Sequence, residues 1–248
     1  MAPKADDAEA ARFDAYLASR GRKAEKIAAI LAEHLGDDLS SLRALDVGCS
    51  LGWIAQALND RFALTVGIDT QRQGLVEAAA GGGETAPHFV AGDGARMPFR
   101  DAQFDVAIYA YVYEHIAEQQ AVADEIWRVL RPGGVCLFSG PNRLAAVEEH
   151  FRLPFLSWLP RPLAALLTRA IRRRAYDVYP RALWTLRHMW RRFAIRDYTV
   201  KMIADPARYS VEEHVGRGGA VSRLPRPLLR ALAPIFPNYN WILEKPRE

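Results

Sequence analysis

The sequence predicts an α/β fold built on a doubly wound, mostly parallel sheet of seven strands. Three observations predict it. Apolar runs of strand length alternate with stretches of helical periodicity, which is the rhythm of βαβ units. A glycine-rich turn joins the first apolar run to a helix. The run 104–110 is apolar throughout after Asp105, as expected for a strand buried on both faces of a parallel sheet.

Each element follows from local periodicity and from the residues that punctuate it. Ala, Leu and Ile recur at three- and four-residue steps over 8–35, which predicts helical structure broken near Gly21. Further helices are expected after the glycine-rich turn, at 71–80, at 117–130, near 161–174 and near 181–193. Glycines 81–83 and the segment Arg-Pro-Gly-Gly at 131–134 are typical of a helix end and a turn. The seven strands are expected at 42–47, 64–68, 88–91, 104–110, 135–139, 195–203 and 239–244.

The length of 248 residues suits one large α/β domain. We expect it to have four parts. Residues 1–40 form N-terminal helices and 41–143 form a core that binds a cofactor. Residues 144–193 form a basic helical cap inserted after the fifth strand, and 194–248 return to the sheet.

Composition and cysteine usage are those of an intracellular globular protein. Half of the residues are hydrophobic and a quarter are charged. Cys49 and Cys136 both lie in apolar strand contexts, which favours buried thiols over a disulfide and a cytoplasmic location. Neither cysteine has a close histidine partner, so we expect no metal site. The N-terminal residues lack the apolar core of a signal peptide, and no apolar run is long enough to span a bilayer.

The segment 42–69 carries the strongest functional signal. It reads as strand, the turn Gly48 to Gly52, helix, a second strand and then Asp69. Such a unit is typical of proteins that bind an adenosine-containing cofactor. The glycines let the backbone approach the ligand, and an acid about twenty residues on accepts from the ribose hydroxyls.

Five motifs then resemble those of the class I S-adenosylmethionine-dependent methyltransferases, in the small-molecule, type 11-like branch. In chain order they are LDVGCSLGW, VGIDT, AGDGARMPF, FDVAIYAYVYEHI and EIWRVLRPGGVCLFSGPNR. Their order and spacing match over about residues 40–143. The resemblance implies a Rossmann-like fold in which 195–203 and 239–244 form the last, antiparallel strand pair. It also implies S-adenosylmethionine as cofactor and a small-molecule substrate.

The resemblance also implies site residues. Asp46 and the turn would face the amino-acid part of the cofactor, where backbone N–H groups at a helix N-terminus can meet its carboxylate. Asp69 would accept from both ribose hydroxyls, and Asp93 from the adenine amino group. Ala110 and Tyr111 would line the mouth where the methyl group is transferred. The full set of expected cofactor-binding residues is Asp46, Gly48, Ser50, Gly52, Asp69, Thr70, Asp93, Gly94, Ala95, Ala110 and Tyr111.

Ser50 departs from the family pattern, which has glycine there, and it leaves alternatives open. Gly48-Cys49-Ser50-Leu51-Gly52 also matches the nucleophile elbow of α/β-hydrolases, although an elbow after the first strand is unusual. An NAD-dependent dehydrogenase would use a similar unit, but it needs a second glycine at Ser50. A non-catalytic cofactor-binding protein is the third alternative.

His115 is the candidate general base for removing a proton from the acceptor, and a helix-start residue that only packs is the competing interpretation. Glu148 and His150 follow the fifth strand at the same edge of the sheet and are candidate substrate contacts. Tyr109, Tyr111 and Tyr113 can shape the pocket, although aromatic residues near a strand end more often belong to the core.

The net charge of +4 conceals a strongly basic segment. Residues 151–193 hold ten arginines, no lysine and a single acid, Asp177. They could bind nucleic acid, lie on an anionic membrane, or cap the site over an acidic substrate. No added nucleic-acid-binding module is present, so we expect no nucleic acid partner. We favour a cap that also touches lipid, for a hydrophobic or lipid-linked acceptor. The sequence carries no signal for an oligomeric state.

Overall fold

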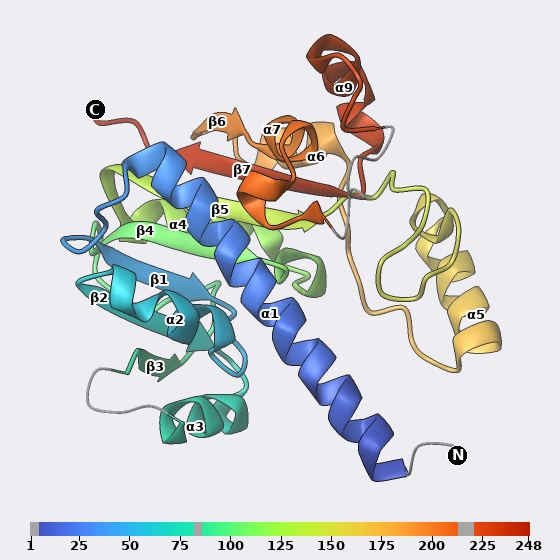
Figure 1. Ribbon diagram of the computed structural model, residues 1–248, viewed down its shortest axis with the longest axis horizontal. Helices are drawn as coiled ribbons and strands as arrows, with labels where there is room; N and C mark the ends of the chain where they lie inside the picture. Colours follow the sequence, from blue (N-terminus) through green and yellow to red (C-terminus); the bar gives the residue numbers. More distant parts are fainter. Residues whose placement is uncertain (1–4, 82–85, 213–220) are drawn as a thin grey trace.

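The computed structural model describes residues 5–81, 86–212 and 221–248. A seven-stranded sheet runs through the centre of the molecule in the order β3-β2-β1-β4-β5-β7-β6 (Figure 1). All neighbouring strands are parallel except β7, which is antiparallel to both β5 and β6. This confirms the predicted fold class. The strands are β1 (Arg43–Val47), β2 (Leu64–Asp69), β3 (His88–Ala91), β4 (Phe104–Ala110), β5 (Leu130–Pro141), β6 (Ala194–Asp197) and β7 (Asn238–Glu244).

The strand order places a topological switch point between β1 and β4. From β1 the chain moves outward through β2 to β3, then returns to β4 and continues the other way to β5. The carboxyl ends of β1 and β4 therefore open onto a crevice between helices that leave the sheet in opposite directions. In doubly wound sheets this is the place where ligands bind.

Helices cover both faces of the sheet, and alternate residues of β4 face the two cores. On one face Val106 and Ile108 pack with α1 (Ala5–Leu35), α2 (Trp53–Leu58) and α7 (Thr199–Ala204). On the other face Ala107 and Tyr109 pack with α4 (Gln119–Val129) and α6 (Leu183–Met189). The remaining described helical elements are η1 (Asn59–Arg61), α3 (Arg72–Ala80), η2 (Tyr113–His115), η3 (Leu156–Trp158), α5 (Arg161–Arg172), η4 (Ala207–Tyr209), α9 (Arg226–Leu232) and η5 (Ala233–Ile235).

The predicted break near Gly21 is wrong, because α1 is one continuous helix of 31 residues that crosses the sheet diagonally (Figure 1). A single glycine inside a helix costs only about 1 kcal/mol relative to alanine. Good helix formers flank Gly21, and buried Ile27, Ile30 and Leu31 hold the C-terminal half against the sheet. Packing therefore outweighs the local cost.

The strand predicted over 195–203 is wrong in its second half. β6 ends at Asp197, and α7 begins two residues later. The Asp197 carboxylate accepts a hydrogen bond from the Thr199 N–H at 2.8 Å, which favours a helical start. The alternation of apolar residues thus reflects a short strand followed by one buried helix face, on which Met202 lies.

The junction of α4 and β5 also differs from the prediction. The helix ends at Val129, and the strand begins at Leu130, which pairs with Phe104. Residues 131–134, predicted as a turn, lie within β5 at a register irregularity. Gly133 has a φ of 72°, and its N–H is 3.0 Å from the Lys245 carbonyl. The Pro-Gly-Gly sequence therefore forms a bulge inside the strand.

The segment between β5 and β6 divides into two structural parts. A small core of its own, which includes Phe151, Ala164 and Tyr176, holds α5 away from the sheet. Figure 1 shows α5 standing at one side of the molecule. By contrast, Leu186 of α6 and Trp190 after it belong to the main core under the sheet. The part that stands apart therefore ends before α6, although the sequence grouped α6 with the cap.

Candidate functional site

A cavity of about 430 Å³ lies at the switch point, and we call it the donor pocket. The ends of β1, β2 and β4, the start of α2 and the turn after β3 surround it. Its lining includes eight of the residues predicted to bind cofactor: Gly48, Ser50, Asp69, Thr70, Asp93, Gly94, Ala110 and Tyr111. Residues from four separate motifs thus converge on one hollow.

The turn after β1 needs its two glycines for different reasons. Gly48 has a φ of 76°, and a Cβ there would lie 2.4 Å from Cγ1 of Val112. Gly52 has a φ of 70°, and a Cβ there would lie 2.5 Å from the Phe89 ring. Gly52 therefore leaves room for the Phe89 ring, and it does not itself line the pocket. Ser50, with a φ of 51°, adopts a left-handed conformation that usually requires glycine.

The Asp69 carboxylate is held by the backbone on either side of it. Oδ2 accepts a hydrogen bond from the Ser50 N–H at 2.8 Å, and Oδ1 accepts one from the Gln71 N–H at 2.8 Å. Each carboxylate oxygen can accept a further bond, so the group is both oriented and able to bind two hydroxyls.

The other predicted acid of the pocket, Asp93, is oriented in a similar way. Its Oδ1 accepts from the Ala95 N–H at 2.8 Å. Ala95 therefore supports Asp93 and is not part of the pocket wall. Two acids on separate strand ends thus face one cavity, which fits the ribose and the base of a nucleoside.

Asp46 lies beneath the turn, where only 3% of its surface is exposed. Burial raises the pKa of its carboxyl to about 7, although a hydrogen bond from the Ala55 N–H opposes the shift. Its Oδ2 has no hydrogen-bond partner within the described parts of the chain. A buried carboxylate oxygen without a partner suits a cationic group, although Asp46 is not among the residues that line the donor pocket.

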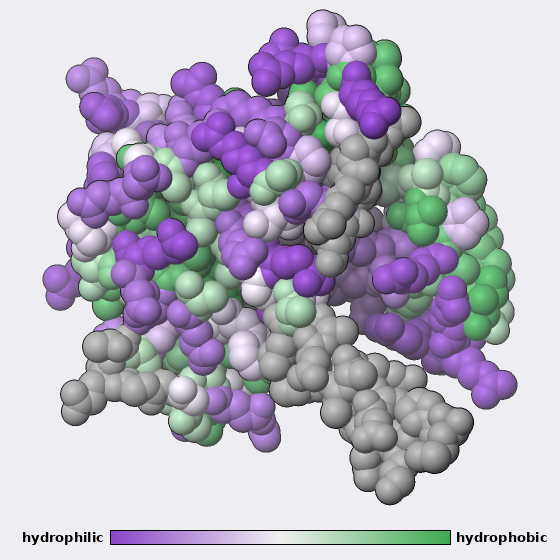
Figure 2. Space-filling model, in the orientation of Figure 1, coloured by the Kyte–Doolittle hydropathy of each residue, from purple (hydrophilic) through white to green (hydrophobic). Residues whose placement is uncertain are grey.

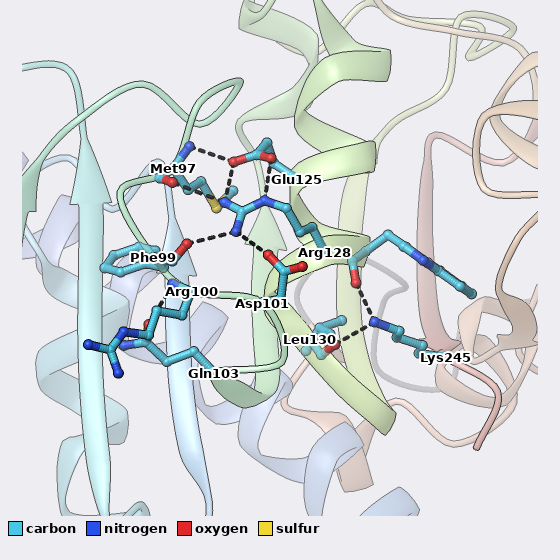
Figure 3. A network of polar contacts seen from close by, with 10 residues as sticks. Met97, Phe99, Arg100, Asp101, Gln103, Glu125, Arg128, Leu130 and Lys245 are labelled. Carbon is cyan, nitrogen blue, oxygen red and sulfur yellow. Dashed lines mark hydrogen bonds and ion pairs between the residues drawn. The ribbon is translucent and has the colours of Figure 1, made fainter. Parts of the chain in front are cut away.

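Arg128 on α4 anchors the loop that follows Asp93 (Figure 3). Its guanidinium donates to the carbonyls of Met97 and Phe99 at 3.0 and 2.7 Å, and it also pairs with Glu125 at 2.7 Å. Glu125 in turn accepts from the Met97 N–H at 2.7 Å. The two side chains therefore bind the loop backbone from both sides and hold the Asp93 turn against the core.

A second cavity of about 400 Å³, which we call the acceptor cavity, lies beside the donor pocket. Most of its lining is apolar, and three cationic residues of α1 border it: Arg22, Lys23 and Lys26. Its apolar lining comes from α7, the segment around Val211 and the region of α9 and η5, and includes Met202, Ile203, Val211, Leu224, Leu232, Ile235 and Phe236.

Tyr111 is part of the wall of both cavities. Its φ of 62° is strained for a tyrosine, and its N–H donates to the Ser139 carbonyl at 2.7 Å. Its hydroxyl accepts a hydrogen bond from Lys26, and the Lys23 ammonium lies 3.8 Å from the ring centroid. Burial raises the pKa of Tyr111, but the charges of Lys26 and Lys23 outweigh it, so the net pKa is below the usual value.

Lys26 is itself a buried cation, with 5% of its surface exposed. Its ammonium donates to Oδ1 of Asn240 at 2.7 Å and to the Ser139 hydroxyl at 3.1 Å. The sequence analysis missed Lys26 and Asn240. A lysine on the same helical face as Ile27, Ile30 and Leu31 was the available signal, since a charge on an apolar face is costly unless it is paired.

His115 borders only the donor pocket and lies at its edge, with the His150 ring 5.0 Å away centroid to centroid. Burial and the nearby His150 lower the pKa of His115. His150 and Glu148 are joined by a hydrogen bond of 2.9 Å, and neither lines the two cavities described. His115, Glu148 and His150 therefore lie together, beside the donor pocket and outside the lining of the acceptor cavity.

Comparison with known proteins agrees with this geometry. Residues 45–138 match the family model of the methyltransferase domain. An uncharacterized methyltransferase of Mycolicibacterium vanbaalenii is 29% identical over 210 residues, which cover 85% of this chain and 72% of that protein. The demethylmenaquinone methyltransferase of Deinococcus radiodurans is 35% identical over 128 residues, which cover 49% of this chain and only 53% of that protein.

A solved structure has the same fold. The S-adenosylmethionine-dependent methyltransferase of Mesorhizobium loti has a TM-score of 0.55 at 16% identity, covering 84% of this chain and 92% of that one. At this identity the likeness concerns the fold alone. Together the matches favour the methyltransferase interpretation over the hydrolase and dehydrogenase alternatives. The sequence match over residues 45–138 and the shared fold support a class I S-adenosylmethionine-dependent methyltransferase.

Proposed function

We propose that this protein transfers the methyl group of S-adenosylmethionine to a small, largely apolar acceptor that carries an ionisable oxygen. One observation carries the proposal. Tyr111 forms part of the wall between a nucleoside-sized pocket lined by Asp69 and Asp93 and an apolar cavity bordered by cations. A donor on one side and an acceptor on the other would meet at this residue.

We infer that the donor pocket holds the cofactor. Asp69 offers two oriented oxygens to a ribose, and Asp93 offers one to an adenine amino group. The backbone of the turn from Gly48 to Gly52 can meet a carboxylate, and buried Asp46 can meet an ammonium group. When bound, the cofactor supplies a methyl group already activated as a sulfonium. The protein then has to align the reactants and exclude water.

The acceptor cavity supports an apolar acceptor with acidic character. Its aliphatic lining favours an apolar body, and Arg22, Lys23 and Lys26 favour an oxygen that carries or develops negative charge. The Deinococcus radiodurans relative is described as a demethylmenaquinone methyltransferase, which agrees with an apolar acceptor of this kind. We therefore place phenolic and carboxylic acids with hydrophobic bodies first among candidates.

We propose Tyr111 as the group that accepts the acceptor's proton. Two ammonium groups favour its ionised form, and Tyr111 itself lines the acceptor cavity. A base is most effective when its pKa is near the working pH, so a lowered tyrosine pKa suits the task. His115, the base proposed from the sequence, stays a candidate only for an acceptor that enters from the donor side.

Ligand-dependent melting tests the donor assignment. S-adenosylmethionine and S-adenosylhomocysteine should raise the melting temperature, because a ligand that prefers the folded state stabilises it. NAD and NADP should leave it unchanged. Asp69→Ala should remove the shift while the variant melts cooperatively, and Asp60→Ala, an exposed acid on η1, should keep it. Stabilisation by NAD instead, or an unchanged shift in Asp69→Ala, would remove the donor assignment.

We also propose that α5 docks on an anionic membrane surface, which would bring an apolar acceptor close to the enzyme. Small residues, Ala164 and Thr168, form the inner face of α5, whereas its large apolar residues face outward (Figure 2). Leu166 is 66% exposed and Ile171 is 56% exposed. Exposed arginines flank this face: Arg169, Arg172, Arg173 and Arg174. An apolar helix face bordered by cations is typical of binding at a lipid interface.

Within the described residues, no helix is both long and apolar enough to cross a membrane. We propose a peripheral contact. Flotation with vesicles of phosphatidylcholine, with and without phosphatidylglycerol, tests it. The protein should float only with the anionic vesicles, and Leu166→Glu should abolish binding. Val76→Glu, at a 62% exposed apolar position on α3, is the matched control and should still bind. Equal flotation of both variants would contradict the assignment to α5.

A further inference from the structure

Two carboxylates and two histidines form a cluster beside the donor pocket, although they are distant in the sequence. Glu114 and His115 follow β4 and lie in η2, whereas Glu148 and His150 lie in the loop after β5. Backbone contacts hold both segments. The Glu114 carbonyl accepts from the Tyr179 N–H at 2.6 Å, and Glu148 accepts from the Phe151 N–H at 2.6 Å.

The potential ligand atoms of this cluster lie near enough to one another to bind a single metal ion, but too far apart to be bonded to one another. One ligand atom from each of Glu114, His115 and His150 lies within 4.8 Å of the other two. Oε1 of Glu114 is 3.8 Å from Nε2 of His150, which is too long for a hydrogen bond. The His115 and His150 rings are nearly perpendicular, at 89°. The three groups face one another without bonding one another.

Glu114 is the member whose environment most needs a partner. Only 2% of its surface is exposed, and Oε2 has no hydrogen-bond partner in the described portion of the structure. A buried carboxylate oxygen without a partner is costly, and proteins usually satisfy such an oxygen with a cation or a hydrogen bond. This observation is independent of the clustering and points to a missing positive charge.

His150 is arranged as a metal-ligating histidine would be. Its Nδ1 is bonded to Glu148 at 2.9 Å, and Glu148 is itself buried. A carboxylate on one ring nitrogen fixes the tautomer, orients the ring and leaves Nε2 available to a metal ion. In this cluster Nε2 is the atom that faces Glu114.

We propose that Glu114, His115 and His150 bind one divalent transition-metal ion, with Zn²⁺ as the best match. Two imidazole nitrogens and one carboxylate oxygen are a ligand set that Zn²⁺ uses, and three protein ligands leave a position for water or a substrate oxygen. Since His115 also borders the donor pocket, the ion lies in the wall of that pocket. The proposal departs from the expectation of no metal, which considered only the cysteines.

Metal titration of the full chain without an affinity tag tests this proposal directly. Competition with a chromophoric chelator measures Zn²⁺ affinity, and visible absorption of the Co²⁺-loaded protein reports the ligand field. We expect one ion per chain. Glu148→Gln should weaken Zn²⁺ binding by about 10- to 100-fold, and Glu114→Gln and His115→Ala, which remove direct ligands, should each weaken it more. His88→Ala, which removes an exposed histidine of β3, should bind as the unchanged protein does.

The opposite results overturn the proposal. Binding of less than one equivalent, equal affinity in the Glu114→Gln and His88→Ala proteins, or a Co²⁺ spectrum of a purely aquated ion would each do so. His115 is exposed, so His115→Ala remains decisive if Glu114→Gln fails to fold. The titration needs neither donor nor acceptor, and its failure is therefore distinguishable from a failure of the proposed methyl transfer.

Discussion

Ser50 keeps a left-handed backbone conformation at the edge of the donor pocket, although it is not a glycine. That conformation costs a residue with a Cβ about 1–2 kcal/mol, whereas glycine loses about 0.5–1 kcal/mol of backbone entropy. Ser50→Gly should therefore raise the free energy of unfolding by about 0.5 kcal/mol or more in a urea titration. Ser50→Ala keeps the Cβ and should change it little. A less stable Ser50→Gly protein would show that the strain is absent.

Asp46 makes the stability of the protein depend on pH. Burial raises the pKa of its carboxyl from 3.8 to about 7. Between these values the folded state binds more protons than the unfolded state, so this residue lowers stability as pH rises through that window. Asp46→Asn cannot ionise. Its free energy of unfolding relative to the unchanged protein should rise between pH 4 and 8, by on the order of 3 kcal/mol.

Chemical denaturation at several pH values measures this difference. Subtracting the free energy of unfolding of the unchanged protein cancels the contributions of the other titrating groups. This requires that Asp69 and Cys49, which neighbour Asp46, keep their environments in the variant. Asp37→Asn, which alters an exposed acid, should show no such trend. A pH-independent difference for Asp46→Asn would mean that this carboxyl is not buried as described.

The residues of the donor pocket were predictable because they follow strand ends. Parallel strands end at one edge of the sheet, so acids after β2 and β3 must approach the turn after β1. Lys26 does not follow a strand end, and its only sequence signal is a charge on the apolar face of α1. The pairing of His115 with His150 was not predictable, because it depends on how the loop after β5 packs on the sheet, and that contact leaves no periodic signal in the sequence.

At the scale of elements, α4 acts on the donor pocket through Arg128. The guanidinium satisfies two loop carbonyls and two carboxylates, Glu125 and Asp101. Arg128→Met should lower the free energy of unfolding by about 1–3 kcal/mol, because the part-buried carbonyls of Met97 and Phe99 lose a charged partner. It should also weaken S-adenosylhomocysteine binding, since the Asp93 turn loses its support. Arg100→Met changes a side chain of the same loop that points away from this network (Figure 3) and should have neither effect.

Calorimetric binding and urea denaturation of the Arg128 and Arg100 variants measure both quantities. Loss of stability with unchanged affinity would show that the loop keeps its shape without Arg128.

The errors in the predicted elements have two causes. At Gly21, contacts that are distant in sequence decide the outcome, whereas in the run 195–203 a local hydrogen bond between Asp197 and Thr199 does so. Burial of Ile27 and Ile30 keeps α1 helical on both sides of Gly21. β6 ends at Asp197 because the side chain of this residue accepts a hydrogen bond at the start of α7. β1, β2 and β4 were predicted closely because they are buried on both faces, where the apolar run and the strand coincide.

For the whole molecule, the account depends on Tyr111 joining two cavities. Its pKa should be below that of an ordinary tyrosine, because Lys26 and Lys23 outweigh burial. An ultraviolet pH titration should show one early ionisation, below pH 10, that Tyr111→Phe removes. Tyr109→Phe is the control, because burial raises the pKa of Tyr109. An early step that persists in Tyr111→Phe would assign it elsewhere.

A crystal structure with S-adenosylhomocysteine bound tests the central claim most directly. The account predicts the ribose hydroxyls on Asp69, the adenine amino group on Asp93, and the sulfur on the side of the pocket that Tyr111 shares with the acceptor cavity. A nucleoside bound outside the space between Asp69 and Asp93, or a sulfur directed away from Tyr111, would contradict it.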